Sequence, residues 1–199
     1  ELMARTGPVN ERQRQFIDRI IFSVQSITAL LADLLDLSQL EAGFATDLEP
    51  TQLALIVRYA VDGIRPLIEA KNLSLAVSLP DHLPHMLGHP IRLRQMVHQL
   101  LDNAVKFTPA EGTLHISLDK QGDFLVLRVS DSGIGIPAED QPHVFERFYR
   151  ARNVIEDYEG AGLGLSLVKS IVDGHNGRVW VESQSGVGTT VTIMFPACR

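Results

Sequence analysis

The sequence has 199 residues, 45% hydrophobic and 21% charged, which is enough apolar material for one domain with an appendage or for two small domains. Its formal net charge of -6, from 18 basic and 24 acidic side chains, argues against a nucleic-acid-binding surface, which is normally basic. The single cysteine, Cys198, excludes an internal disulfide and a cysteine-clustered zinc site. No apolar run is long enough to span a bilayer, so we expect no membrane contact by this sequence.

Residues 10–42 are predicted to form one long helix. Asn10 can cap its start, with Gln13 reaching back three residues later, and Gly43 can end it. The apolar positions alternate spacings of four and three, which is typical of a helix packed along another helix. These positions are Phe16, Ile20, Ser23, Ile27, Leu30, Leu34 and Leu37. The stripe therefore needs a partner, which a second copy of the chain can supply.

The organisation of the chain changes on either side of this helix. Residues 1–6, before a Gly-Pro turn, are predicted to be the end of a preceding antiparallel helix, and the chain opens without methionine, so we expect a longer parent protein. Past Glu49-Pro50 the pattern alternates between helices and strands. We therefore predict a truncated helical hairpin over 1–45 and an α/β domain over 50–199.

Periodicity predicts the elements of the second domain. Helices are expected over 52–71, 91–107 and 164–175, and strands over 73–79, 113–119, 124–130, 178–183 and 189–195. The strands 113–119 and 124–130 are expected to form a hairpin. The irregular segment from Ser132 to Gly164 is too long for a passive connection, which indicates a functional or disordered loop.

Three polar side chains share one face of the 91–107 helix, because Gln99, Asn103 and Lys106 stand at i, i+4 and i+7. The opposite face is apolar. It consists of Met96, Val97, Leu100, Leu101, Ala104 and Val105. An amide oxygen suits magnesium, and a lysine suits phosphate. From periodicity alone, a plain surface helix is the simpler interpretation.

Two glycine segments flank the long loop. The first, Asp131-Ser132-Gly133-Ile134-Gly135, follows a strand and lets the backbone approach a flat ligand, with Asp131 able to accept a hydrogen bond from an adenine amino group. Ordinary turn chemistry explains the same residues. The second, 160–165, leads into a helix and can turn N–H groups toward phosphates, although it is not a P-loop. Between them, Phe145 and Phe148 are expected to cover the core from a short amphipathic helix.

In combination and in this order, the motifs resemble those of sensor histidine kinases. The matches are Asn103 with Lys106 to the asparagine box, 131–135 to the first glycine box, Phe145 and Phe148 to the phenylalanine box, and 160–165 to the second glycine box. Residues 186–190 resemble the last glycine motif of that family, and residues 34–43 resemble its second dimerisation helix. The resemblance covers nearly the whole chain.

The resemblance implies a two-layer α/β (α+β) sandwich with helices on one face of a mixed sheet, preceded by a long dimerisation helix. The same sandwich is shared with gyrase-type ATPases and the large heat-shock chaperones. The resemblance further implies a protein-histidine kinase that uses ATP and Mg²⁺, forms a homodimer through the 10–42 helix, and is cytoplasmic. It would transfer the γ-phosphoryl group to a histidine, for relay to an aspartate of a response-regulator receiver domain.

By the same resemblance, Asn103 is expected to ligate magnesium and Lys106 to meet phosphate. Phe107 is expected to line the adenine pocket, and Asp131 to read the adenine amino group. Residues 137–160 would form a lid over ATP. The other implied ATP-binding positions are Gly133, Gly135, Arg150, Gly160, Gly162, Gly164, Leu165 and Thr189. Gly162 and Gly164 would hinge the lid, and Arg150 would contact the phosphates.

Three features depart from the family pattern. Gln99 stands where these kinases often carry another asparagine and where the related ATPases carry a general-base glutamate, and an amide cannot accept that proton at neutral pH. Glu159 stands where a second glycine is common. None of the seven histidines lies in a His-Glu-x-x-Thr/Asn-Pro setting, and all seven are expected to be ordinary structural or surface residues. They are His82, His85, His89, His98, His115, His143 and His175.

We therefore expect the phosphoacceptor upstream, and a fragment that binds nucleotide without autophosphorylating. Two other functions fit the same residues. One is an ATP-hydrolysing relative with the same sandwich. The other is a degenerate kinase that serves as a dimerisation and docking module, with Gln99 and Glu159 marking the loss of activity.

Overall fold

The computed structural model describes residues 10–14, 16, 17, 20, 21, 48–155, 158 and 160–198. At its start the expected capping box is present. The N–H of Asn10 donates to Gln13 Oε1 at 3.0 Å, and the N–H of Gln13 donates to Asn10 Oδ1 at 2.9 Å. Most of the predicted 10–42 helix and its stripe, residues 1–6, Gly43 and Glu159 lie outside the described residues.

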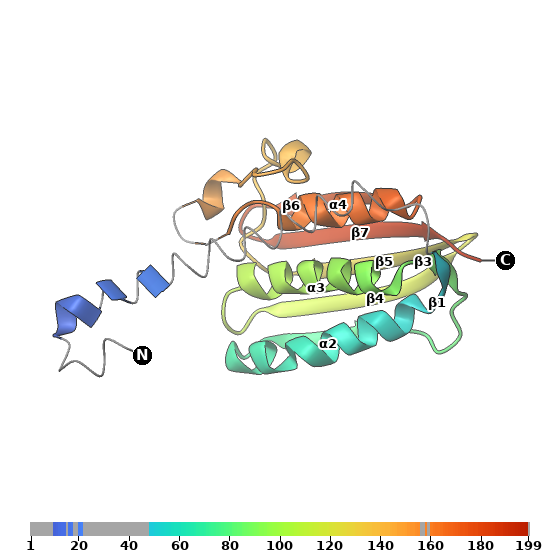
Figure 1. The fold of residues 1–199 in the computed structure, drawn as a ribbon, viewed down its shortest axis with the longest axis horizontal. Coiled ribbons are helices and arrows are strands. Elements are labelled where there is room, and N and C mark those ends of the chain that lie inside the picture. The colour runs from blue at the N-terminus through green and yellow to red at the C-terminus, as the bar shows by residue number, and fades with distance from the viewer. Residues whose placement is uncertain are drawn as a thin grey trace.

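A mixed five-stranded sheet forms the back layer of the domain (Figure 1). Its strands are β2 (Ser74–Ser78), β4 (Thr113–Gln121), β5 (Phe124–Asp131), β6 (Arg178–Gln184) and β7 (Gly188–Pro196). They lie in the order β2-β4-β5-β7-β6, with β2 parallel to β4 and the other neighbours antiparallel. The predicted hairpin is confirmed as β4 and β5, whose two-residue connection begins at Gly122 with a φ of 61°.

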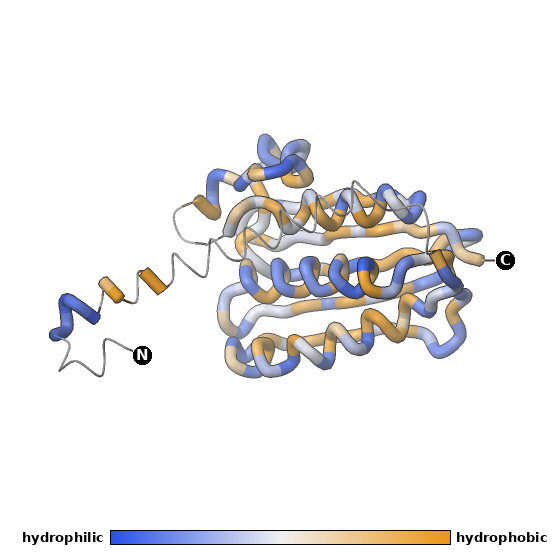
Figure 2. Tube along the Cα trace, viewed as in Figure 1, coloured by the Kyte–Doolittle hydropathy of each residue, from blue (hydrophilic) through white to orange (hydrophobic). Residues whose placement is uncertain are grey.

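Three helices lie side by side on one face of this sheet (Figure 1). They are α2 (Leu53–Ala70), α3 (Pro90–Phe107) and α4 (Gly164–Gly174). Hydrophobic and hydrophilic residues alternate along each of them (Figure 2), and all six residues of the predicted apolar face of the 91–107 helix are buried. The predicted sandwich, with helices on one face of a mixed sheet, is therefore confirmed.

In its described residues, the long segment between the glycine motifs contains two short 3-10 helices, η2 (Gln141–His143) and η3 (Arg152–Val154), joined by turns, bends and irregular backbone. Across the described residues, no helix is both long enough and apolar enough to cross a membrane.

A small two-stranded sheet was not predicted from the sequence. It pairs β1 (Glu49–Thr51) with β3 (Met86–Gly88) in antiparallel fashion. The hydroxyl of Thr51 donates to the carbonyl of Gly88 at 3.1 Å, and the Met86 side chain is fully buried. A three-residue strand is too short for alternation to reveal it, since that signal needs four to eight residues.

His175 connects the end of α4 to the start of α3. Its side chain is only 3% exposed, so of the two kinds of histidine that the sequence led us to expect, structural and surface, it is a structural one. Nδ1 lies 2.6 Å from the carbonyl of Ile171, and Nε2 accepts the backbone N–H of His89 at 2.9 Å. The ring must therefore be neutral, with its proton on Nδ1. Burial lowers the pKa of His175, and the nearby His89 adds to the lowering.

We expect His175 to make the domain less stable in mild acid. Because its pKa is lowered on folding, the unfolded chain takes up the proton first as the pH falls below about 6.5. The free energy of unfolding is then fully retained above that pH and decreases below it. Urea unfolding at pH 7.5 and pH 5.5 should show a smaller loss of stability for His175→Gln than for the parent.

The matched control is His115→Gln, which removes an exposed histidine on β4. This variant should keep the pH dependence of the parent. An identical pH dependence in His175→Gln and in the parent would contradict the assignment.

Candidate functional site

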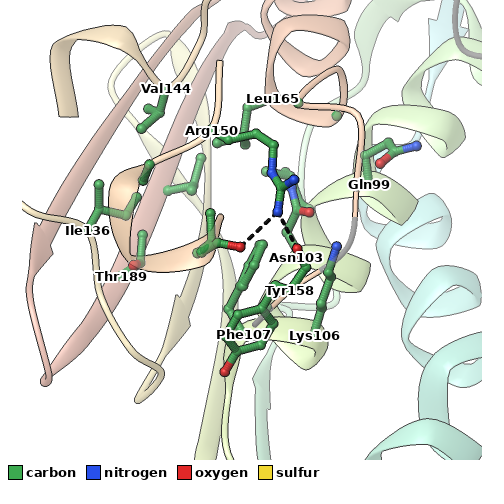
Figure 3. Close-up of a pocket in the computed structure, with 18 of the residues that line it drawn as sticks. Gln99, Asn103, Lys106, Phe107, Ile136, Val144, Arg150, Tyr158, Leu165 and Thr189 are labelled. Carbon is green, nitrogen blue, oxygen red and sulfur yellow. Dashed lines mark hydrogen bonds between the residues drawn. The ribbon is translucent and has the colours of Figure 1, made fainter. Parts of the chain in front are cut away.

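The polar face of α3 opens into a cavity of about 250 Å³. Gln99, Asn103 and Lys106 all line it, so the predicted common face is confirmed (Figure 3). Phe107, the last residue of the helix, lines it too, and the Lys106 ammonium lies 5.2 Å from the centre of its ring. The cation, the amides and the aromatic ring are therefore presented together by one helix.

Asp131 enters the cavity from the end of β5. Burial raises the pKa of its carboxyl, while hydrogen bonds from the backbone N–H groups of Gly133 and Thr189 partly offset the rise. The Gly133 bond to Oδ1 measures 2.8 Å. A carboxylate has about four acceptor positions, so capacity remains for a further donor. The group can therefore receive a hydrogen bond from a molecule in the cavity.

The glycines of the 131–135 segment have different roles. A Cβ on Gly133 would lie 2.5 Å from the carbonyl oxygen of Phe107, so this position must be glycine for the loop to pack against the end of α3. Gly133 is not among the cavity-lining residues, and it acts by holding Asp131. Gly135 lines the cavity with a φ of 65°, and a Cβ there would lie 2.0 Å from the carbonyl of Gln184.

The second glycine run makes three close approaches. A Cβ on Gly160 would lie 3.1 Å from Lys106 Nζ, and one on Gly164 would lie 3.0 Å from Gln99 Oε1. Gly162 has a φ of 72°, and a Cβ there would lie 2.5 Å from the carbonyl of Tyr149. These glycines let the start of α4 reach the polar face of α3. Leu163, Gly164 and Leu165 line the cavity there.

No side chain caps the first turn of α4. The first N–H groups of a helix lack partners within the helix and carry its positive end. Because this turn borders the cavity beside Lys106, it provides a second source of positive potential for an anion.

Arg150 lines the cavity, and its guanidinium is engaged with the loop that it belongs to (Figure 3). Nη2 donates to the carbonyl of Val154 at 2.8 Å, to that of Ile155 at 3.3 Å, and to that of Tyr158. The residue therefore holds the carbonyls of Val154, Ile155 and Tyr158 around its own side chain.

The expected amphipathic helix around Phe145 and Phe148 is wrong. These residues lie in turns, and the Phe148 side chain is 58% exposed. Phe148 has a φ of 63°, and its N–H donates to the carbonyl of Gly162 at 2.9 Å. This bond reverses the chain where a helix would have continued. Val144 takes the buried, cavity-lining position instead.

Two features of the 137–160 segment were missed by the sequence reasoning. The ring of Tyr158 lies in the cavity wall, 5.1 Å from the ring of Phe107 between centres. Asp140 is 1% exposed and accepts the Tyr149 hydroxyl at 2.7 Å and the N–H of Arg152 at 2.9 Å. These bonds, the Arg152 N–H first, lower the pKa of Asp140. An isolated aromatic just before a glycine run was the only available signal for Tyr158.

The residues predicted for the site are thus brought together around one cavity, Gly133 excepted. The lining includes Gln99, Asn103, Lys106, Phe107, Asp131, Gly135, Arg150, Gly160, Gly162, Gly164, Leu165 and Thr189. Within the part of the chain that the structure describes, no group of three or more His, Cys, Asp or Glu side chains could hold a metal ion. A protein contribution to metal binding at the cavity would come from the Asn103 amide oxygen.

Comparison with known proteins places this fold and site in a class. The family model of the histidine kinase-, DNA gyrase B-, and HSP90-like ATPases matches residues 88–199. A second family model, the His Kinase A (phospho-acceptor) domain, matches residues 1–43. The chain belongs to the sensor histidine kinases of this ATPase superfamily.

The relatives agree with this assignment. The circadian input-output histidine kinase CikA of Synechococcus elongatus is 37% identical over 194 residues, which are 96% of this chain and 26% of that protein. The autoinducer 2 sensor kinase/phosphatase LuxQ of Vibrio parahaemolyticus is 35% identical over 194 residues, 94% of this chain and 23% of that protein. The chain therefore spans about a quarter of these two relatives.

Solved structures show the same fold. Full-length ShkA in complex with AMPPNP aligns with a TM-score of 0.76 and 24% identity, covering 97% of this chain and 41% of that one. The mycobacterial sensor histidine kinase MprB aligns with a TM-score of 0.66 and 27% identity, covering 76% of this chain and 98% of that one.

The glycine requirement can be tested with a matched pair of alanine variants. Gly135 and Gly122 have similar φ angles, 65° and 61°, but nothing lies within 4 Å of a Cβ on Gly122. Gly122→Ala should lower the free energy of unfolding by about 1–2 kcal/mol, which is the cost of a left-handed backbone for a residue with a Cβ. Gly135→Ala should lose about 1–3 kcal/mol more, because its methyl group overlaps the Gln184 carbonyl. Urea unfolding measures both, and equal losses would contradict the close approach.

Proposed function

We propose that the cavity binds ATP together with Mg²⁺. The observation that carries this proposal is that Asn103 and Lys106, Asp131, and the uncapped start of α4 line one cavity. These groups suit a nucleotide, since they offer a metal ligand, positive charge for phosphates, and an acceptor for a base.

For the adenine base, the proposed contact is a hydrogen bond from its amino group to Asp131. Guanine presents an oxygen at the corresponding place, so a carboxylate there selects adenine. Phe107 and Ile134 supply apolar surface beside it, and Gly135 lets the backbone come close.

For the phosphates, the proposed contacts are Lys106 and the N–H groups at the start of α4. Gly160, Gly162 and Leu165 border this region, and Thr189 borders the cavity from β7. Asn103 would hold Mg²⁺, which supplies charge neutralisation at the phosphoryl group when bound. Arg150 remains a proposed phosphate ligand of the nucleotide-bound state, in which it would exchange its bonds to the loop carbonyls.

For the whole protein, we propose transfer of the γ-phosphoryl group to a histidine N-terminal to residue 1. Two observations support this: the phospho-acceptor family model matches residues 1–43, and the first histidine of the sequence is His82. The residues present here would act by positioning and charge neutralisation, because phosphoryl transfer asks little covalent chemistry of the protein. Gln99 cannot serve as a general base.

The proposed partners follow from the same match. A homodimer through the 10–42 helix would bury its heptad stripe, and the phosphoryl group would pass to a response-regulator receiver domain. The division into 1–45 and 50–199 and the cytoplasmic location are proposed on the same basis.

The nucleotide site can be tested with Asp131→Asn. The parent should bind ADP with Mg²⁺ and prefer it to GDP, measured by calorimetric titration. At about 100 times its Kd, ADP should stabilise the fold by about 2.7 kcal/mol. Asp131→Asn should lose about 1.5–3 kcal/mol of binding energy, the worth of a hydrogen bond to a charged group. Asp123→Asn, an exposed carboxyl in the β4–β5 turn, is the control and should bind like the parent.

A parent chain that binds no nucleotide at millimolar concentration would favour the dimerisation and docking module instead. Equal affinity of the two aspartate variants would remove Asp131 from the site.

A measurement of phosphate release distinguishes a kinase from the alternative function, an ATP-hydrolysing protein with the same sandwich. With Gln99 in place of a base, the chain alone should release almost no phosphate from ATP and should not phosphorylate itself. A coupled phosphate assay measures this on the parent and on Asn103→Ala. Substantial release that Asn103→Ala abolishes would support an ATP-hydrolysing protein rather than a kinase.

A further inference from the structure

The helix that carries the site ends differently from its two neighbours. α2 ends with Asn72 at a φ of 52°, and α4 ends with Asn176 at a φ of 53°. In each, the N–H groups after the last turn return to the helix carbonyls: Leu73 donates to Ile68 and Gly177 donates to Val172. This is the Schellman motif, in which a left-handed residue satisfies the final carbonyls locally.

α3 has no such local ending. Thr108, the residue after it, is extended with φ -88° and ψ 124°. The next residue is Pro109, which disfavours helical backbone before it and has no N–H to return. The last four carbonyls of a helix lack partners within the helix. Those of α3 must therefore be satisfied by groups from outside it.

Lys71 supplies the partner of two of these four carbonyls, and of the carbonyl of Thr108, which follows the helix. Its ammonium donates to the carbonyls of Val105 at 2.8 Å, Lys106 at 3.1 Å and Thr108 at 3.0 Å. Lysine has three donors, and all three are accounted for by these bonds. The Thr108 hydroxyl donates to the carbonyl of Ala104 at 2.6 Å.

The remaining carbonyl, that of Phe107, accepts the N–H of Ile134 at 3.2 Å. Ile134 belongs to the loop that follows Asp131, so the end of α3 and this loop are joined by one hydrogen bond. Any shift of the last turn of α3 would therefore move both sides of the cavity.

The arrangement of helices makes a cation favourable at this place. α2 and α3 run side by side, and both finish at the same end of the strands of the sheet (Figure 1). Each helix carries a partial negative charge at its C-terminus. Lys71 directly follows α2 and reaches the end of α3, so its charge lies between the two ends.

We propose that Lys71 is a positioning residue for the nucleotide site. It holds the last turn of α3, and thereby fixes the directions in which Asn103, Lys106 and Phe107 meet a nucleotide. It does not touch the nucleotide itself, since Lys71 is not among the cavity-lining residues. The inference rests on the proposed nucleotide binding.

The test compares Lys71→Met with Lys71→Arg and with two controls. Methionine keeps the length of the side chain and removes the charge and the donors, while arginine keeps both. Lys120→Met removes an exposed lysine at the end of β4. Ile64→Val or Ile64→Ala, whichever matches the loss of Tm in Lys71→Met, weakens the buried face of α2 and leaves Lys71 in place.

Two quantities are measured on each variant: the Kd for ADP with Mg²⁺, and hydrogen exchange of the amides of residues 104–107. Lys71→Met should bind ADP roughly tenfold more weakly, because small displacements of contact groups are costly. Its last turn of α3 should exchange faster. Lys71→Arg should recover much of the ADP affinity and of the protection from hydrogen exchange. The two controls should keep the affinity of the unsubstituted chain.

The outcomes distinguish the two proposals. If the unsubstituted chain binds ADP and Lys71→Met binds it with the same Kd, the proposed role of Lys71 is overturned and the proposed function stands. The same affinity loss in the Ile64 control as in Lys71→Met would show general destabilisation and would also overturn it. A parent that does not bind ADP would overturn the proposed function, and this inference with it.

Discussion

The directions of the polar groups at the cavity depend on how α3 packs against the sheet. Leu93, Met96 and Val97 are completely buried on its inner side. An α-helix turns by about 100° per residue, so rotation by a single position would expose this face. Each buried side chain of this size contributes about 1.5–3 kcal/mol, which leaves the helix one favourable rotation. In that rotation Asn103 and Lys106 point into the cavity.

The rest of the cavity is built by segments that pack closely against this helix. Gly133 meets the end of α3, and Gly164 meets its polar face. The lid segment is organised by its own bonds, with the buried carboxylate of Asp140 holding Tyr149 and Arg152. An ionised buried carboxylate is tolerated when several donors surround it. The site therefore combines a rigid helix with a loop that has a defined internal structure.

The sequence predicted the features that depend on local pattern. The three long helices and five longer strands agree with the structure to within two residues, because each spans enough residues to show its period. The common face of Gln99, Asn103 and Lys106 followed from helical geometry alone. The Asn10–Gln13 cap followed from spacing.

The features that were missed depend on contacts between distant residues. β1 and β3 pair Glu49 with Gly88 and Thr51 with Met86, and the Thr51 hydroxyl reaches a carbonyl 37 positions away. Lys71 reaches carbonyls 34 to 37 positions away, and a backbone acceptor leaves no mark on the sequence. The helix expected around Phe148 was wrong because the left-handed backbone of that residue depends on a hydrogen bond to Gly162. Periodicity does not report such a bond.

The link between His175 and the start of α3 has a consequence for motion. Leu167, Val168 and Ile171 anchor α4 to the core along its length, and His175 fixes its far end through the His89 N–H. The helix is thus held to the core along its whole length, while the glycines just before it allow backbone rotations that other residues do not. The resemblance implied hinges at Gly162 and Gly164, but Gly164 is the first residue of α4. We therefore propose that the 137–160 segment pivots at Gly160 and Gly162, upstream of a stationary α4. The uncapped N–H groups would then stay in place as the loop swings over them.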